Sequence, residues 1–361
     1  MAVQSEDRSL SYSELRDNVT YLSSLIKSNG IYRTSIAICV PKDICHIVAI
    51  LATIDSNNVF VPIDYKLPLK RIKMQFLEAN IQFAIVNNET KDIIKNIDKN
   101  IIQINIDTYK INKKKFIINN KFDDLTSYIF FTSGSTGKPK AILGSYKGLW
   151  SFLEWEIKEF KVNSSYNISF ISAIGFDPML RDIFLPLLVG GTLFIPTMDE
   201  LLDINKFINW IKSNNINLIH IVPTLFKYLF NSCSVDDLVN LKYILLAGEL
   251  LRGKDIEFFY KKHLDSNTKL INLYGPSESI LAKFYHYITY DDLNSNFIPV
   301  GKPISHVKYK LIDSNGHTIS DNSRGEIIIM PNFKLLGYYN NPEKNKEAFT
   351  KKFSFSKYYN S

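Results

Sequence analysis

The sequence predicts an α/β protein in which parallel sheets carry helices on their faces. Short apolar segments alternate with segments whose apolar residues recur at helical spacing, over most of residues 1–284. Such alternation gives parallel strands joined by helical crossovers. From about residue 285 the pattern changes to short strands, among them VKYKLID before the Asn315-Gly316 turn, which is typical of a hairpin. We therefore expect an α/β core with two sheet subdomains over residues 1–284 and a β-rich region over residues 285–361.

The individual elements follow from spacing, caps and breakers. Ser11 and Glu14 form a capping box, so a helix is expected from Tyr12 to about Asn29, before Gly30. Further helices are expected at 43–54, 69–79, 147–158, after Pro178, at 204–213 and at 223–230. Strands are expected at 35–40, 59–64, 83–86, 101–106, 128–131, 167–172, 192–196, 217–222, 243–246 and 269–273. The rest of residues 87–124 shows little pattern.

The composition limits the class of protein. Hydrophobic residues make up 45% of the 361 residues, which is enough for a sizeable core. There is no apolar run of about 18 residues and the N-terminus is polar, so we expect neither a membrane span nor a secretory signal. The net charge is +7, but the lysines are scattered, so we expect no nucleic-acid partner. The three cysteines form no CxxC pair, which suits a reducing cytoplasm, and no metal is expected at Cys39, Cys45 and His46.

One stretch, from Tyr128 to Leu149, carries the strongest chemical signal. An apolar strand is followed by TSGSTG, a loop of hydroxylated and flexible residues. Two lysines on either side of a proline come next. Glycines allow close backbone approach, and successive N–H groups in such a turn form an anion-binding concavity. The natural ligand is a nucleotide phosphate. Thr132 and Pro139 depart from the P-loop pattern, and the alternative is a plain solvated turn.

A second stretch, NLYGPSES at 272–279, predicts a nucleotide-binding strand end. Tyr274 offers a stacking face for a purine, and Asn272 can hydrogen-bond the adenine edge. Ser277 can contact phosphate, and Glu278 offers the carboxylate oxygens that Mg²⁺ prefers. The alternative for YGP alone is an ordinary turn.

Three other features have structural alternatives. Asp177 ends a strand just before Pro178, where it could be a plain helix N-cap. GELLRGKD, which begins at Gly248, nearly matches a P-loop, but Asp255 stands where a Mg²⁺-binding hydroxyl should be, so we expect no P-loop there. His220 lies in an apolar strand and is expected to be a packed core residue.

Together these stretches resemble the AMP-forming adenylating enzymes, which include acyl-CoA synthetases, luciferases and the adenylation domains of nonribosomal peptide synthetases. The family pattern YTSGTTGxPKG is matched by FTSGSTGKPKA, with Phe131, Ser135 and Ala141 as departures, and Tyr146 replaces a later family His. NLYGPSE matches the family's NxYGPTE, and RGEIIIM, at 324–330, resembles the motif that follows it. The resemblance covers nearly the whole chain.

The resemblance implies a fold of layered parallel sheets flanked by helices, with a small, distorted β-barrel lobe after about residue 285. It implies that the chain covers most of the family's large N-terminal domain. In relatives, an Asp that holds the ribose and a mobile C-terminal lobe with a catalytic lysine would follow, and the sequence has no counterpart to either. We therefore expect the isolated chain to be weakly active or inactive.

The function implied is activation of an α-amino acid by ATP, which gives aminoacyl-AMP and pyrophosphate. Relatives then load the product onto a phosphopantetheine carrier domain beside neighbouring synthetase modules. Because the substrate carboxylate is already a nucleophile, catalysis would rest on positioning and charge stabilisation. The catalytic positions are Thr136, Lys140 and Glu278, the last also holding Mg²⁺. The positions implied for ATP are Thr132, Ser133, Gly134, Ser135, Gly137, Gly248, Glu249, Asn272, Tyr274, Gly275 and Ser277.

The resemblance also implies a substrate pocket. Its positions are Asp177, Pro178, Arg181, Thr224, Leu245, Ala247, Leu273, Leu281 and Ala282. In synthetase adenylation domains the first of these pairs with the substrate's α-ammonium, so we expect an α-amino acid of small to medium size. Arg181 either faces an acidic or strongly polar substrate group or turns out to solvent with Asp182. Two alternatives remain open: an acyl- or aryl-CoA ligase of the same fold, and a non-catalytic ATP- or amino-acid-binding fragment.

Overall fold

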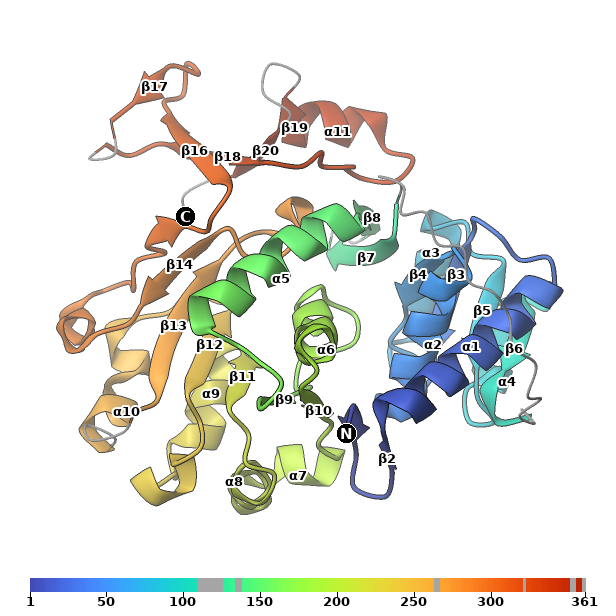
Figure 1. The fold of residues 1–361 in the computed structure, drawn as a ribbon. Coiled ribbons are helices and arrows are strands. Elements are labelled where there is room, and N and C mark those ends of the chain that lie inside the picture. Colours follow the sequence, from blue (N-terminus) through green and yellow to red (C-terminus); the bar gives the residue numbers. More distant parts are fainter. Residues whose placement is uncertain (109–125, 134–137, 263–266, 321–322, 351–354, 359–361) are drawn as a thin grey trace. The chain divides into compact units, whose positions relative to one another are not determined.

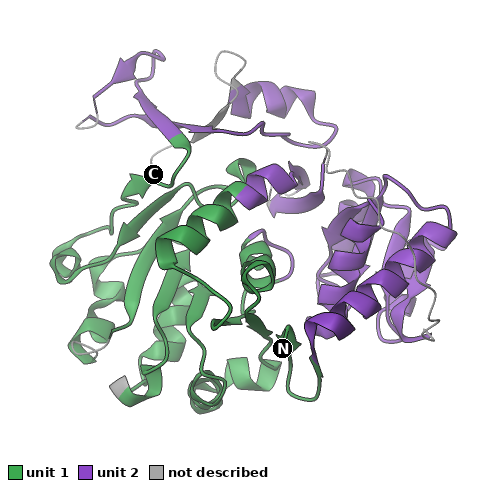
Figure 2. Cartoon of the chain, in the orientation of Figure 1, with its two compact units in different colours: residues 1–9, 151–173, 178–307 green, residues 10–150, 174–177, 308–361 purple. Residues whose placement is uncertain are grey.

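The computed structural model describes residues 1–108, 126–133, 138–262, 267–320, 323–350 and 355–358 (Figure 1). The chain forms two compact units, each assembled from separate segments (Figure 2). Unit 1 comprises residues 1–9, 151–173 and 178–307, and unit 2 comprises residues 10–150, 174–177 and 308–361. The division expected after residue 284 stays a prediction.

Unit 1 is built around a nine-stranded sheet with the strand order β15-β14-β13-β12-β11-β9-β10-β1-β2. Neighbours from β1 to β13 pair in parallel, whereas β14 and β15 pair antiparallel. The strands are β1 (Val3–Gln4), β2 (Ser9–Leu10), β9 (Asn167–Ser169), β10 (Thr192–Phe194), β11 (Leu218–Ile221), β12 (Tyr243–Ala247), β13 (Lys269–Tyr274), β14 (Phe284–Tyr287) and β15 (Lys302–Pro303). The main helices are α5 (Tyr146–Phe160), which begins in unit 2, α6 (Pro178–Val189), α7 (Met198–Leu202), α8 (Ile204–Ser213), α9 (Pro223–Phe230) and α10 (Glu257–Lys262).

The two faces of this sheet pack against different helices. Because side chains alternate along a strand, β11 and β12 supply both faces. Ile219 and Ile244 share one buried core with Phe226 of α9 and with residues of α8 and α10. Their neighbours His220 and Leu245 are opposite one another in register, so they share the other face.

Helix α5 covers that second face. The ring of Trp155 lies 4.8 Å from that of Tyr285, and the ring of Phe160 lies 4.9 Å from that of Tyr243, centroid to centroid. Tyr243 lies on the same face as Leu245 because the two are two residues apart on β12. Tyr285 lies on this face too, because it is opposite Leu273 of β13, which is opposite Ala247 of β12. We name this surface of the sheet the α5 face.

Unit 2 contains a six-stranded sheet with the order β6-β5-β3-β4-β7-β8. All pairs are parallel except β7 with β8. The strands are β3 (Ser35–Cys39), β4 (Val59–Pro62), β5 (Phe83–Val86), β6 (Ile102–Asn105), β7 (Tyr128–Ser133) and β8 (Pro139–Gly144). Its helices are α1 (Tyr12–Ser28), α2 (Ile44–Asp55), α3 (Leu69–Glu78) and α4 (Lys91–Ile97). The predicted capping box of α1 is confirmed, because Ser11 and Glu14 exchange hydrogen bonds.

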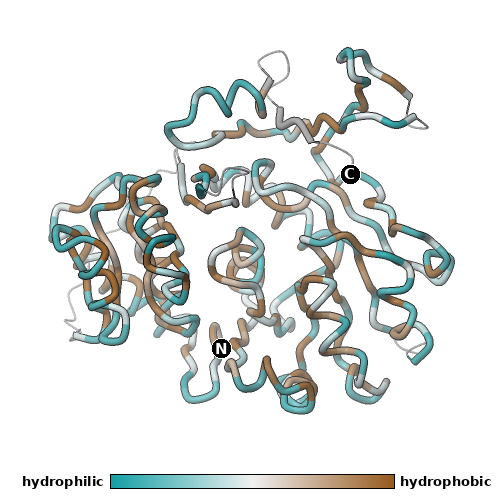
Figure 3. Tube along the Cα trace, turned by 180° about the vertical axis from the view of Figure 1, so that it is seen from behind, coloured by the Kyte–Doolittle hydropathy of each residue, from teal (hydrophilic) through white to brown (hydrophobic). Residues whose placement is uncertain are grey.

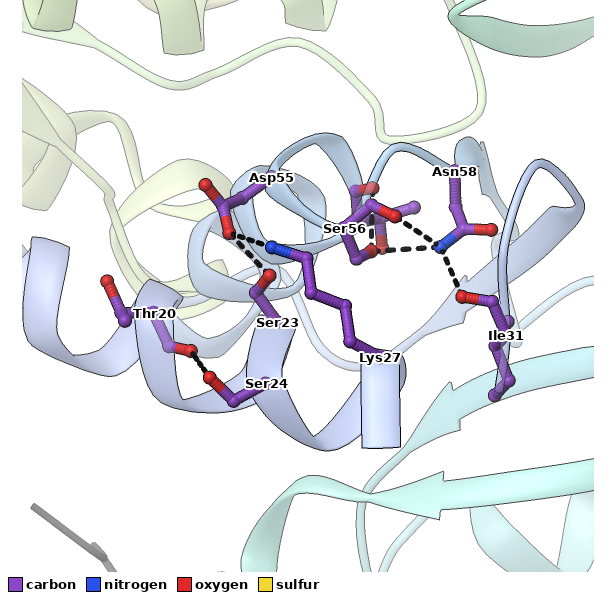
Figure 4. Close-up of polar contacts among 9 residues, drawn as sticks. Thr20, Ser23, Ser24, Lys27, Ile31, Asp55, Ser56 and Asn58 are labelled. Atoms are coloured by element: carbon purple, nitrogen blue, oxygen red, sulfur yellow. Dashed lines mark hydrogen bonds and ion pairs between the residues drawn. The ribbon is translucent and has the colours of Figure 1, made fainter. Parts of the chain in front are cut away.

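A polar contact ties α1 to α2 in unit 2 (Figure 4). The Oδ2 atom of Asp55, at the end of α2, accepts hydrogen bonds from the Ser23 hydroxyl and from Lys27 Nζ, the latter at 3.1 Å. Nearby, Asn58 Nδ2 donates to the Ile31 carbonyl at 3.2 Å. These bonds fix the start of the strand that follows each helix.

Strand β8 and helix α4 are among the elements of unit 2 that were not predicted. Strand β8 was missed because its ends, Pro139 and Gly144, are typical of turns, yet its Ala141 and Ile142 are buried beside β7. Helix α4 was missed within the Lys-, Asn- and Ile-rich segment. In unit 1, β9 is shorter than expected and ends at Ser169.

Unit 2 also holds a second sheet with the order β17-β16-β18-β20-β19. Its elements are β16 (Val307–Ile312), β17 (Thr318–Ile319), β18 (Glu326–Pro331), β19 (Phe349–Thr350) and β20 (Phe355–Tyr358), with α11 (Pro342–Ala348). The predicted hairpin at the Asn315-Gly316 turn is confirmed as β16 and β17. Within the described residues this sheet is open, with β17 and β19 at its edges, so the expected barrel is corrected to an open sheet.

Hydrophobic residues follow the strands of both large sheets (Figure 3). The longest buried runs include β3, β5 and β11. Parallel strands are covered by helices on both faces of the sheet, so their side chains are buried on both sides. In the part of the chain that is described, no helix is both long and apolar enough to span a membrane.

Candidate active site

The TSGSTG segment joins two neighbouring antiparallel strands of unit 2. Strand β7 runs into it and β8 leaves it, with Thr132 opposite Lys140 and Ser133 opposite Pro139. Thr132 is half-buried. The predicted phosphate-binding residues Gly134, Ser135, Thr136 and Gly137 lie outside the described residues, so their roles stay predictions.

Lys140 lies next to this segment on β8. Its Nζ atom is 5.6 Å from the centroid of the Tyr338 ring, within the range of a cation–π contact. The side chain is only half-buried, so it retains access to solvent. A lysine held in this way supplies a positive charge beside the end of the hairpin.

Asp177 is a nearly buried carboxylate just before α6. Its exposed fraction is 9%. Burial raises the pKa of the Tyr128 phenol well above its ordinary value, and the charges of Asp177 and Tyr146 raise it further, which places the carboxylate near β7 within unit 2. Burying a carboxylate is costly unless a partner compensates it. The chain thus places a carboxylate, mostly shielded from solvent, directly ahead of α6.

Three predicted pocket residues share the α5 face of the nine-stranded sheet. Leu245 and Ala247 are two residues apart on β12, and Ala247 lies opposite Leu273 of β13. Leu281 and Ala282 are buried in the segment that links β13 to β14. The sequence-predicted apolar set is therefore brought to one face and one adjoining turn of unit 1.

Helix α6 contributes the polar part of this region. Pro178 begins the helix and is half-buried, and Arg181 follows one turn later with an exposed fraction of 3%. Asp182 is fully buried. The expectation that Arg181 and Asp182 could turn out to solvent is therefore wrong. The helix presents both side chains to the protein interior. Its exposed surface lies at other positions, such as Leu188.

Two predicted site residues contact each other at the start of α9. Glu249 Oε2 accepts hydrogen bonds from the Thr224 backbone N–H at 2.9 Å and from its hydroxyl at 2.7 Å. An anion is favourable at a helix N-terminus. Gly248 has φ +89°, a conformation that favours glycine. Thr224 is exposed, so it lies at the edge of the predicted pocket.

The NLYGPSES segment forms the end of β13 and a short 3₁₀ turn (Ser277–Ser279). Asn272 Nδ2 donates to the Pro299 carbonyl at 2.9 Å, which fixes the amide at the strand end. Tyr274 is half-buried, and burial raises the pKa of its phenol. Ser277 and Glu278 are half-buried in the turn.

The donor set fits a magnesium ion shared with a phosphate better than a protein-only metal centre. Within the described residues, no three His, Cys, Asp or Glu side chains are grouped to hold a metal. Glu278 offers one carboxylate, and Mg²⁺ is commonly held by one or two carboxylates together with substrate phosphates. Glu278 is thus a suitable single ligand.

Gly275 allows the turn after β13 to pack tightly. A Cβ atom there would lie 2.4 Å from the Leu281 carbonyl oxygen and 2.6 Å from the Ala282 Cα. No real side chain tolerates such contacts with backbone atoms. Packing of this turn therefore requires glycine at position 275, whereas its predicted role in binding ATP stays a prediction.

Sequence reasoning missed a buried polar array on the α5 face. His220 is buried, as predicted, but its two ring nitrogens contact carboxylates from two helices: Asp182 of α6 and Glu156 of α5. It also missed Lys283, whose side chain is fully buried. The only sequence signal is a charged residue at an otherwise apolar position.

Comparison with known proteins agrees with this geometry. A family described as "AMP-binding enzyme" matches residues 1–339. Tyrocidine synthase 3 of Brevibacillus parabrevis is 27% identical over 350 residues, which cover 96% of this chain and 5% of the relative. Gramicidin S synthase 1 of Brevibacillus brevis is 26% identical over 354 residues, which cover 97% of this chain and 31% of the relative.

Solved structures share the fold. The N-terminal subdomain of Klebsiella oxytoca NpsA, in complex with 3-hydroxybenzoyl-AMSN, has a TM-score of 0.86 at 21% identity and covers 100% of this chain and 91% of that one. The nonribosomal peptide synthetase FmoA3 has a TM-score of 0.88 at 20% identity and covers 99% of this chain and 39% of that one.

The fold and the motif positions thus define an α/β protein of the adenylate-forming class. The chain belongs to the AMP-binding enzyme family, and its relatives are nonribosomal peptide synthetases. It spans only a small part of the two synthetases compared above.

Proposed function

We propose that this chain is the ATP- and substrate-binding part of an adenylation domain that activates an α-amino acid. The observation that carries the proposal is Asp177, a nearly buried carboxylate directly ahead of α6. That helix brings Asp182, which follows the buried Arg181, against His220 on the α5 face, where Leu245 and Leu273 also lie. A substrate with an α-ammonium group suits a buried anion.

In the proposed reaction, a carboxylate oxygen of the amino acid attacks the α-phosphorus of ATP. A new P–O bond forms, the bond to the β-phosphate oxygen breaks, and pyrophosphate leaves with both electrons of that bond. No general base is needed. The protein's task is to align the reactants and stabilise the charge of the transition state.

Each group of residues has a proposed part in this alignment. Asp177 would hold the α-ammonium, and Tyr274 would stack against the adenine. Lys140 would add positive charge at the phosphates, together with Thr132 and the loop residues predicted from the sequence. Glu278 would hold Mg²⁺, which neutralises phosphate charge when bound. The aminoacyl-AMP would pass to a phosphopantetheine carrier domain, as expected of a synthetase module.

The direct test is a thermal-shift series with non-hydrolysable aminoacyl-adenylate analogues, one per amino acid. A ligand that binds only the folded chain raises the midpoint by mass action. We expect a large shift with a few analogues and its loss in Asp177→Asn, while the exposed Asp291→Asn keeps it. A shift of equal size in Asp177→Asn would contradict the role given to that carboxylate.

An aryl or acyl substrate is the second candidate. The observation in its favour is that the K. oxytoca subdomain was solved with a 3-hydroxybenzoyl analogue. We therefore include that analogue in the series. A larger shift with it than with any aminoacyl analogue would favour an aryl-activating enzyme and overturn the amino-acid assignment.

A further inference from the structure

Four charged side chains are buried together on the α5 face of unit 1. His220 Nδ1 lies 2.7 Å from Asp182 Oδ1, and His220 Nε2 lies 2.7 Å from Glu156 Oε1. All three side chains have no exposed surface. Arg181, which precedes Asp182 on α6, is also buried, and its charge acts on His220. We call these four residues the charged array.

The geometry of the array sets how many protons the histidine and its two carboxyl groups share. A neutral imidazole has a single N–H, so it can donate to only one of two carboxylates. Both ring nitrogens of His220 are at hydrogen-bonding distance from a carboxylate oxygen, which favours the imidazolium. Burial and the charge of Arg181 lower the pKa of His220, but Glu156 and Asp182 outweigh them, and the pKa lies above its ordinary value.

With these protons the central triad carries one net negative charge. Two carboxylates contribute two negative charges and the imidazolium contributes one positive charge. Glu156 Oε2 is buried and accepts no hydrogen bond from the described residues. A buried net charge is strongly unfavourable unless another charge compensates it. Arg181 is the cation of the array, and it brings the sum to zero.

We infer that Arg181 is the counter-ion of Glu156, Asp182 and His220, and that the pocket therefore accepts an amino acid with an uncharged side chain. This inference rests on the proposed function. An acidic side chain would add an anion to a region that is already balanced, and a basic one would add a cation. Either would have to be buried against the apolar surface of Leu245 and Leu273.

Lys283, a further buried lysine of unit 1, directs its N–H groups at the backbone. Lys283 Nζ donates to the carbonyl of Ile280, and it lies 3.4 Å from that of Leu281 and 3.1 Å from that of Ala282. An ammonium has three N–H groups, which matches three carbonyls. Lys283 is thus directed at the backbone of its own turn.

The first test needs no ligand. We would measure the thermal midpoint of the chain with Arg181→Met, with Glu156→Gln, and with both changes. If Arg181 is the counter-ion, Arg181→Met lowers the midpoint by several degrees, and in the Glu156→Gln background the loss becomes much smaller or reverses. Arg71→Met, on the exposed side of α3, should change little in either background. Equal losses from Arg181→Met in both backgrounds would overturn the inference.

Should Arg181→Met fail to fold, Arg181→Lys keeps the test decisive. Lysine retains the charge but not the planar group, so a counter-ion role predicts that Arg181→Lys folds where Arg181→Met does not. Lysine should lose this advantage over methionine once each is combined with Glu156→Gln. Glu156→Gln removes the negative charge at position 156, so combining it with Arg181→Met should also allow soluble protein to be recovered. Failure of the double variant to recover soluble protein would count against the counter-ion role.

The second test uses matched analogue pairs in the same thermal-shift series. The asparaginyl and glutaminyl adenylate analogues are compared with the aspartyl and glutamyl ones, and leucyl and alanyl with lysyl. We expect every strong ligand to be uncharged in its side chain, with at least tenfold weaker binding of each acid than of its amide. Tighter binding of an acidic analogue would overturn the inference. If no analogue binds, but the Arg181→Met and Glu156→Gln variants behave as expected, the proposed function is rejected and the counter-ion role is still supported.

Discussion

The ammonium of Lys283 lies 3.1 Å from the carbonyl oxygen of Ala282 in the turn between β13 and β14. The same Nζ atom donates to the carbonyl of Ile280. Ile280 and Leu281 have φ values of 66° and 59°, a region that non-glycine residues rarely adopt and that is especially unfavourable for a β-branched side chain. The buried lysine therefore holds a strained turn that carries two predicted pocket residues.

Replacing this lysine should destabilise the fold. Lys283→Met keeps the length of the side chain but leaves buried carbonyls without their donor. We expect a loss of about 2 kcal/mol in the free energy of unfolding, measured by urea denaturation. Lys308→Met, at an exposed position of β16, should change it by less than about 0.5 kcal/mol. If both variants behave alike, the ammonium does not hold the turn.

Gly275 is predicted to tolerate no side chain. In Gly275→Ala the new Cβ would meet backbone atoms of Leu281 and Ala282 at 2.4 and 2.6 Å, and backbone cannot move aside as a flexible side chain can. We expect a loss of roughly 2–3 kcal/mol in urea denaturation. The matched control is Gly175→Ala, because nothing lies within 4 Å of a Cβ there. An equal and small effect at both glycines would show that the turn can relax.

Much of the fold was predictable because its signals are local. The capping box at Ser11, the alternation of apolar strands with helices, and the Asn315-Gly316 turn each lie within a few residues of one another. Strand β8 was not predictable, because Pro139 and Lys140 resemble loop residues until β7 pairs with them. The expected barrel was also wrong, since sheet closure depends on which strand edges meet and the sequence does not encode that locally.

The site was predictable to the extent that it lies in contiguous motifs. The α5 face was not, because its polar partners are distant in sequence: Glu156 is 64 residues from His220, and Asp182 is 38. No motif records such pairs. The single signal at Lys283, a charged residue after apolar ones, did not predict its burial, because such a lysine also suggests exposure. Burial of Arg181 was left open for the same reason, since its environment is built by other elements.

His220 should make stability depend on pH above neutrality. Its folded pKa lies above its unfolded value, so its contribution is present below the unfolded value of about 6.5 and is lost as the pH rises through the folded value. We expect the urea midpoint to fall as the pH rises above about 6.5, and the fall to be smaller in His220→Gln. His317→Gln, at an exposed position, should keep the full fall. An unchanged pH dependence in His220→Gln would mean that the imidazole does not gain a proton on folding.

His46 should act in the opposite direction and at lower pH. It is fully buried in α2, and burial, only partly offset by the Val40 carbonyl 3.4 Å away, lowers its pKa to about 4. Between the unfolded value of about 6.5 and pH 4, the unfolded chain binds a proton that the folded chain cannot. Stability should therefore fall by roughly 2 kcal/mol from pH 7 to pH 5 through this group alone.

The measurement for His46 is urea denaturation of the chain and of His46→Leu at pH 7 and pH 5. Leucine cannot bind a proton, so the variant should lose less stability over this interval, whatever its stability at pH 7. His317→Leu should behave like the unchanged chain, because that side chain is exposed. An identical loss in the chain and in His46→Leu would show that the buried ring is protonated in the folded state, and the low pKa would then be wrong.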